Sequence, residues 1–198
     1  MVKHSLRNVT FVRFLIYAGK EKSECAKGGQ MMRIPNEFVH PLFFREGEVM
    51  KIKDEKPFPH MMKIVYFYYD MIEREPFPWS NIEQSIPAVL QLWNEEKEML
   101  EGCFAKRDRR SARAPMIRGL SYLLSCLFWL NGRRVKNVRH WQEEIRALPL
   151  KPVNCPERLQ FVFDRCDIYH SFIQLSELFE ETAKLAYKQM AINKRMSR

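Results

Sequence analysis

The sequence predicts an all-α protein, a single compact domain whose helices pack around one buried central helix at about residues 115–131. Apolar residues recur at spacings of three and four in several segments, the period of an amphipathic helix. Only seven glycines occur in 198 residues, too few for the tight turns of a barrel or sandwich. The hydrophobic fraction of 46% and charged fraction of 29% are ordinary for a globular chain with a core.

The first 31 residues are interpreted as an N-terminal extension. Residues 27–32 read KGGQMM, and Lys-Gly-Gly-Gln can be encoded by bases that resemble a strong bacterial ribosome-binding sequence just before a Met codon. We therefore expect translation to start at Met31 or Met32. The alternative is that Gly28 and Gly29 form a flexible joint between an arm and the domain.

Residues 32–80 carry mixed signals. A short helical or turn segment lies between Pro35 and Pro41, and a brief strand is predicted at 49–52. A helix is then predicted from Pro59 to Glu75, because its apolar residues follow a helical stripe. The run IVYFYY (64–69) would also suit a strand by propensity. The aromatic residues of this stretch, with Trp79 and Trp93, are expected in the core rather than in a ligand groove.

Two long helices are predicted next. Ser80 and Glu83 have the spacing of a capping box, so we expect one turn at 81–85, then a helix from about 86 to 106 with Pro87 in its first turn. Pro115 is expected to open the central helix, and Asn131-Gly132 to close it. The uncharged run 119–132 has fourteen residues, fewer than the roughly 20 that a transmembrane helix needs.

The remaining chain predicts a short helix around Trp141–Leu148, another from Pro156, and a long final helix ending near 190. The domain is accordingly assigned to residues 32–190, and residues 191–198 to a basic C-terminal tail. The five cysteines form no CxxC pair and are an odd number, which disfavours a disulfide framework or zinc site and favours a reducing cytoplasm.

Three long stretches carry a family resemblance: IPNEFVHPLFF (34–44), PMIRGLSYLLSCLFWLNGRR (115–134) and LPLKPVNCPERLQFVFDRCDIYHSFIQLSELFEE (148–181). With Trp79, Ile86-Pro87 and Trp93, they resemble the YpoC-like proteins of Bacillus-type bacteria. The resemblance covers roughly residues 33–187. It implies no particular chemistry, and no catalytic residue is carried over from it.

A basic run is the first candidate site. The segment KRDRRSAR (106–113) supplies Lys106, Arg107, Arg109, Arg110 and Arg113, which could contact phosphates. Arg133 and Arg134 gather at the other end of the central helix. Two interpretations stay open: a nucleic-acid surface, or a solvated interhelical loop.

A second candidate is the trio Asp164, Asp167 and His170, whose spacing by threes would suit a metal site or a proton relay. Asp167 would equally suit the N-cap of the last helix, and Asp164 the end of the preceding one. Glycine-rich phosphate loops are absent from the sequence, and no cofactor is expected.

The favoured functional prediction is a cytoplasmic, non-catalytic interaction or accessory module with an unidentified protein partner. Association with nucleic acid through the Arg-rich segment is an open extension of it, in keeping with a formal net charge of +9. The alternative is a metal-dependent hydrolase that uses Asp164, Asp167 and His170.

Overall fold

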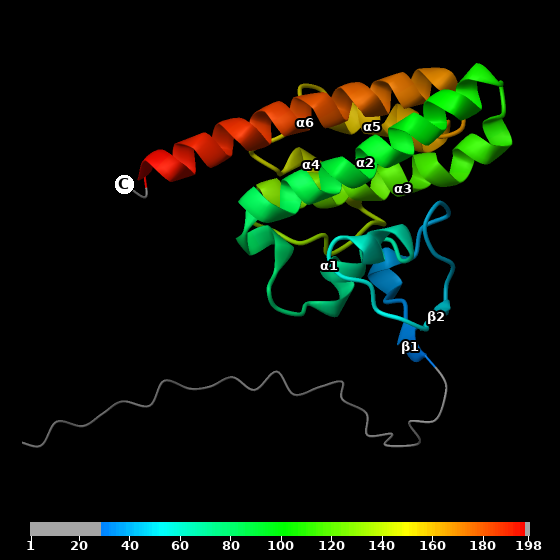
Figure 1. Cartoon of the computed structure of the whole chain (residues 1–198), viewed down its shortest axis with the longest axis horizontal. Coiled ribbons are helices and arrows are strands. Elements are labelled where there is room, and N and C mark those ends of the chain that lie inside the picture. The colour runs from blue at the N-terminus through cyan, green and yellow to red at the C-terminus, as the bar shows by residue number, and fades with distance from the viewer. Residues whose placement is uncertain (1–28, 197–198) are drawn as a thin grey trace, which may run out of the picture.

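Three long helices lie side by side in the computed structural model, which describes residues 29–196 (Figure 1). They are α2 (Ile82–Ala105), α3 (Arg109–Leu130) and α6 (Tyr169–Met196). α2 and α3 form an antiparallel hairpin joined by residues 106–108, and α6 runs in the same direction as α3. The all-α prediction is confirmed, because helices dominate and the described residues add only a two-stranded sheet.

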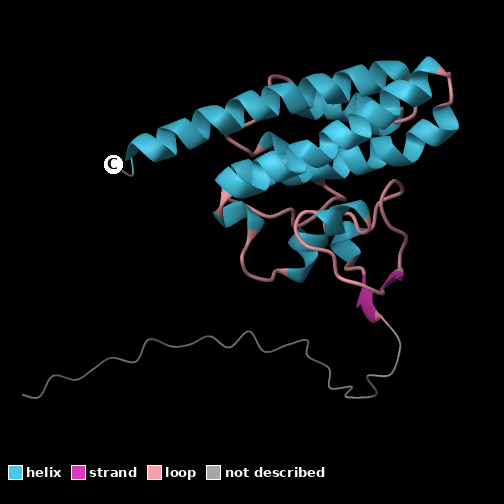
Figure 2. Cartoon of the chain, viewed as in Figure 1, coloured by secondary structure: helices cyan, strands magenta, loops and turns pink. Residues whose placement is uncertain are grey.

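Shorter elements pack on this three-helix layer, and the N-terminal segment lies below it in the view of Figure 2. α4 (Trp141–Arg146) packs on α5 (Cys155–Asp164), which packs on α6. The N-terminal segment contains α1 (Tyr68–Ile72) and the antiparallel strands β1 (Gln30–Arg33) and β2 (Val49–Ile52). The strand predicted at 49–52 is thus confirmed, whereas its partner was not predicted.

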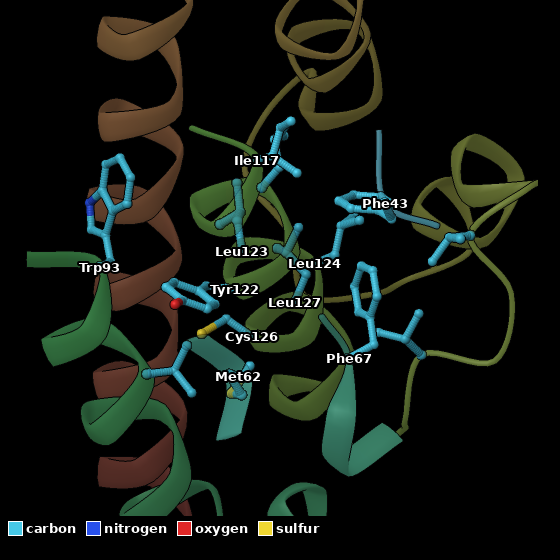
Figure 3. Packing of buried hydrophobic residues seen from close by; sticks show 14 of the residues in the cluster. Phe43, Met62, Phe67, Trp93, Ile117, Tyr122, Leu123, Leu124, Cys126 and Leu127 are labelled. Atoms are coloured by element: carbon cyan, nitrogen blue, oxygen red, sulfur yellow. The ribbon is translucent and has the colours of Figure 1, made fainter. Parts of the chain in front are cut away.

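The C-terminal half of α3 is the core of the fold. All residues from Gly119 to Leu130 are buried, including Leu123 and Leu127 at 0% exposure and Leu130 at 4%. Figure 3 shows Leu124 and Leu127 on the side of Phe67, and Tyr122 on the side of Trp93. The prediction of a buried central helix is confirmed, and these leucines line no open cleft.

The start of α3 differs from the prediction. The helix begins at Arg109, because the Asp108 side chain caps it by accepting a hydrogen bond from the Ser111 backbone N–H at 3.0 Å. Pro115 lies inside the helix instead of opening it. The segment 106–113 is therefore not a loop: only residues 106–108 connect the helices, and the later arginines lie on the first turns of α3.

α2 is also longer than predicted. It is continuous from Ile82, and Pro87 does not divide it. Its N-cap is Asn81, whose side chain accepts from the Gln84 backbone N–H at 3.3 Å. Ser80 does not form the expected capping box, since its hydroxyl donates to the Phe77 carbonyl at 2.7 Å.

The single helix predicted at 59–75 is wrong. The segment holds a 3₁₀ turn at His60–Lys63 and the five-residue α1, separated by Phe67 with a left-handed φ of 56°. Phe67 is fully buried, with ring centroids 5.6 Å from Phe38 and 4.9 Å from Phe43. Aromatic packing has overridden helix periodicity here.

The element ends give two further outcomes. Gly132, with φ 66°, ends α3 as predicted: its N–H donates to the Trp129 carbonyl and the Arg133 N–H to the Phe128 carbonyl. α6 continues as a helix to Met196, into the stretch assigned to a tail.

Glycine at position 29 has a packing reason, because an added Cβ would fall 2.2 Å from the Ile52 carbonyl oxygen. β1 crosses the predicted boundary at 31/32, since Gln30 and Met31 pair with β2. The expectations for residues 1–28 lie outside the described residues.

Candidate nucleic-acid interface

Basic and aromatic side chains gather where α2 ends and α3 begins. We call this surface the basic corner, and it consists of Lys106, Arg107, Arg109, Arg110, Arg113, Arg165, Tyr169 and His170, all of them exposed. The first five were predicted from the sequence. The α5–α6 connector and the first turn of α6 supply the last three.

Specific contacts bring these distant segments together. Arg109 donates from Nε to the Asp167 carbonyl and from Nη2 to the Asp167 carboxylate, both at 3.2 Å. Arg113 approaches the Cys166 thiol at 3.5 Å. The Tyr169 ring packs edge-on against Phe104 near the end of α2, with centroids 5.7 Å apart. The α5–α6 connector is therefore fixed against the start of α3.

Most cations of the basic corner are not neutralised by the protein. Lys106, Arg107, Arg110 and Arg165 make no ion pair with any residue between 29 and 196. Asp108 is the N-cap of α3, and the pKa of its carboxyl is lowered first by the Ser111 backbone N–H and also by the nearby Arg110, which it partly balances. The described surface thus has an excess of positive charge.

The helix direction adds to this positive potential. Arg109 and Arg110 occupy the first turn of α3, which contains no acidic residue. The N-terminal end of a helix carries a partial positive charge, so cations there destabilise the helix by several tenths of a kcal/mol, roughly 0.3–1. The arginines lie where helix stability alone would favour Asp or Glu.

Arg133 and Arg134 are not part of the basic corner. They follow the far end of α3, whose 22 residues span roughly 33 Å. There they line a separate cavity of about 480 Å³, which we call the Trp79 pocket. Its lining includes the aromatic residues Phe77 and Trp79, the cations Arg133, Arg134 and Lys136, and the carboxylates Glu73 and Glu144.

The trio Asp164, Asp167 and His170 does not come together as a metal site. Within residues 29–196, no three His, Cys, Asp or Glu side chains are grouped closely enough to hold a metal ion. Asp167 pairs with Arg109. Asp164 ends α5 as predicted and accepts from the Gln160 amide at 2.7 Å.

An apolar cavity of about 550 Å³ lies between α1 and the start of α2, with walls that include Phe58, Tyr69 and Phe77. Its lining is electrically balanced, because it contains the cations Lys56 and Arg74 and the carboxylates Glu55 and Glu75. Arg74 donates to Glu55 at 3.1 Å. The lining charges give this cavity no preference for an anionic or cationic ligand.

Comparison with known proteins adds the family. The sequence profile described as YpoC-like protein matches residues 83–194. The chain belongs to the YpoC-like family. A curated relative, the "Uncharacterized protein YpoC" of Bacillus subtilis (strain 168), is 34% identical over 131 residues, which cover 66% of this chain and 79% of the relative. No solved structure matches.

The YpoC-like region runs from the first turn of α2 to the last turns of α6, and it contains the whole basic corner. The two strands and α1 precede it. No helix between residues 29 and 196 has a run that is both long and apolar enough to cross a membrane. The predicted family resemblance is confirmed.

Proposed function

We propose that this YpoC-like protein is a non-catalytic accessory module that binds single-stranded nucleic acid at the basic corner. The observation that carries the proposal is the position of Tyr169, which is 54% exposed and packs on Phe104 at the end of α2. The Phe104 carbonyl accepts from the backbone N–H of Arg107, and the Arg107 side chain forms no ion pair with a described residue. Non-specific single-strand binding combines cations that follow the phosphates with aromatic rings on which bases stack.

Each part has a defined role. Arg107 and Arg110 would contact phosphates and release counterions. Tyr169 would offer one ring face to a base, while Phe104 supports the ring from α2. A cytoplasmic location is part of the proposal, and it is supported by the free thiols of Cys103, Cys126, Cys155 and Cys166, which suit a reducing compartment.

Fluorescence anisotropy with a labelled oligothymidine and a duplex of equal length tests the proposal. We expect affinity for the single strand to fall steeply between about 50 and 200 mM salt. The double variant Arg107→Glu/Arg110→Glu should lose at least about tenfold in affinity and reduce the salt slope by about one to two. Tyr169→Ala should weaken binding to the single strand by about fivefold or more, because stacking is worth about 1–3 kcal/mol per base.

A matched control carries the same charge change elsewhere. Lys51 on β2 and Lys188 on α6 are exposed and lie outside the basic corner. The variant Lys51→Glu/Lys188→Glu should keep nearly all of the affinity. Equal losses in both double variants, or no binding even at low salt, would refute the proposal. Preference for the duplex together with an unaffected Tyr169→Ala variant would refute the single-strand assignment.

A further inference from the structure

The Trp79 pocket combines an aromatic wall with cationic groups at the far end of α3. Trp79 is half-buried and stacks on Phe77, with ring centroids 5.0 Å apart and planes inclined by 16°. The chain has four tryptophans, and the other three, Trp93, Trp129 and Trp141, are at most 3% exposed. Trp79 is therefore the tryptophan whose indole a ligand can reach, and stacking on Phe77 fixes the orientation of that indole ring.

The backbone ends α3 in a way that leads directly into the pocket. The Arg133 N–H donates to the Phe128 carbonyl at 3.0 Å, which closes the helix with Gly132 in the left-handed conformation. Arg134 is anchored, because its guanidinium pairs with Glu73 at 2.8 Å and donates to the Asp70 carbonyl at 3.1 Å. These contacts fix the start of the connector that carries the pocket cations.

Arg133 and Lys136 differ from Arg134 in having no such anchor. Both are exposed, and neither forms an ion pair with any described residue. A favourable interaction with the C-terminal end of the helix dipole accounts for Arg134. It does not require two further cations, Arg133 and Lys136, in the same pocket. Arg133 and Lys136 are the groups available to a phosphate.

The negative end of α3 opposes an anion only weakly here. Its last carbonyls are already hydrogen-bonded: Leu127 accepts from the Asn131 amide at 2.7 Å, and Phe128 and Trp129 accept the two closing bonds of the helix. Carbonyls that already accept hydrogen bonds present less uncompensated negative charge to the pocket.

Glu144 supplies a complementary acceptor on the same pocket. Its carboxylate makes no ion pair with a described residue, and a carboxylate is a common acceptor for the exocyclic amine of a nucleobase. A volume of about 480 Å³ lies within the usual range for ligand pockets, about 300–1,000 Å³.

From these features we infer that the Trp79 pocket binds a nucleoside phosphate. The base stacks on Trp79, the phosphate lies between Arg133 and Lys136, and an amino group on the base donates to Glu144. The site is separate from the basic corner, which lies at the other end of α3, so either can fail without the other.

Tryptophan fluorescence of the full chain, titrated with ADP, tests the inference. We expect saturable quenching, because the exposed tryptophan is the one in the pocket. Adenosine should bind at least about tenfold more weakly, since it lacks the charge-assisted bonds to phosphate. Inosine diphosphate, which lacks the exocyclic amine, should also bind more weakly than ADP. Pyrophosphate should compete with ADP without quenching.

Variants separate the two basic sites. Arg133→Ala/Lys136→Ala should raise the Kd for ADP at least about tenfold, whereas the matched pair Arg107→Ala/Arg110→Ala in the basic corner should leave it unchanged. Trp79→Phe should remove the quenching while calorimetry still detects ADP. The inference is overturned if millimolar ADP gives no saturable signal by either method. It is equally overturned if the two double variants weaken ADP binding to the same extent.

Discussion

The buried carboxylate of Asp70 offers the sharpest test of the energetics of this fold. It is fully buried in α1 and accepts three hydrogen bonds: from Trp129 Nε1 at 2.8 Å, from the Val135 backbone N–H at 2.9 Å and from the Ser125 hydroxyl at 3.0 Å. Asp70 thereby joins the N-terminal segment to α3 and to the connector that follows it.

Burial raises the pKa of Asp70 from an ordinary 3.8 to about 6, although the bonds from Trp129, Val135 and Ser125 act in the opposite direction. The folded protein therefore binds more protons than the unfolded chain between these two pH values. The stability that Asp70 contributes is fully present below about pH 4 and is lost as the pH rises to about 6. A shift of about two pKa units corresponds to about 3 kcal/mol.

Substitution Asp70→Asn removes the titration and keeps the hydrogen-bonding shape. The amide oxygen can still accept from Trp129 and Val135, and the amide nitrogen can donate to the Ser125 oxygen. We expect the free energy of unfolding of the variant, relative to the parent, to rise by about 3 kcal/mol between pH 4 and pH 7. Asp70→Ala leaves two buried N–H donors without an acceptor, and should be less stable than Asp70→Asn by about 2–6 kcal/mol.

Urea unfolding of the parent and both variants, at pH values from 4 to 8, measures these differences directly. Other titrating groups cancel in the comparison with the parent, so the pH dependence isolates Asp70. A parent-to-variant difference for Asp70→Asn that stays constant over the whole range would show that the carboxylate is not destabilised by burial. Equal destabilisation by Asn and Ala would show that the charge itself holds the contact.

Three further predictions concern the helices. Gly119→Ala should destabilise the protein by about 1–3 kcal/mol in urea unfolding, because the new Cβ would lie 2.6 Å from the Trp93 ring; Gly102→Ala, with open space around the position, is its control. Gly132→Ala should cost about 1 kcal/mol by the same measurement, owing to the φ of 66°. Arg118→Leu should reduce the free energy of unfolding by about 3–5 kcal/mol, because the buried Glu96 would lose the two hydrogen bonds that it accepts from Arg118 at 2.6 and 2.7 Å. The double variant Arg118→Leu/Glu96→Leu should recover most of this stability. No recovery in the double variant would contradict this reasoning.

The sequence was sufficient for the central helix because its apolar run is uninterrupted and its glycine stop is unambiguous. It was insufficient for the start of that helix. Pro115 is a familiar first-turn residue, but Asp108 supplies a cap earlier in the chain, and the helix accommodates the proline. The segment around Phe67 differs from the prediction for another reason. Its aromatic cluster includes Phe38 and Phe43, which are distant in sequence, and the periodicity of apolar residues within a segment carries no information about such contacts.

The candidate site was only half visible in the sequence. The run of arginines at 106–113 is evident in the sequence, whereas the sequence does not show that Tyr169 lies near it. Tyr169 follows the arginines by more than fifty positions and joins them through the Asp167–Arg109 contact and the Phe104 ring. In the same contact the Asp167 carboxylate forms an ion pair with Arg109, whereas its spacing from Asp164 and His170 suggests a metal ligand. The buried hydrogen bonds of Asp70 had one signal in the sequence, which is the position of a charged residue directly after the aromatic run 66–69.

The cations at the two ends of α3 have different effects on the stability of the fold. The C-terminal half of α3, from Gly119 to Leu130, is buried, so the cations that a partner can reach lie on the first turns of the helix and on the connector that follows it. Arg134, at the C-terminal end, complements the helix dipole and has protein partners, so its presence needs no ligand. Arg110, at the N-terminal end, opposes the dipole and forms no ion pair with a described residue, although its charge contributes to the lowered pKa of the nearby Asp108 carboxyl. Replacement of Arg110 by Glu should therefore stabilise the fold by several tenths of a kcal/mol while weakening nucleic-acid binding. Opposite signs for stability and binding at one position would identify a residue kept for a partner rather than for the fold, and a loss of both would remove that argument.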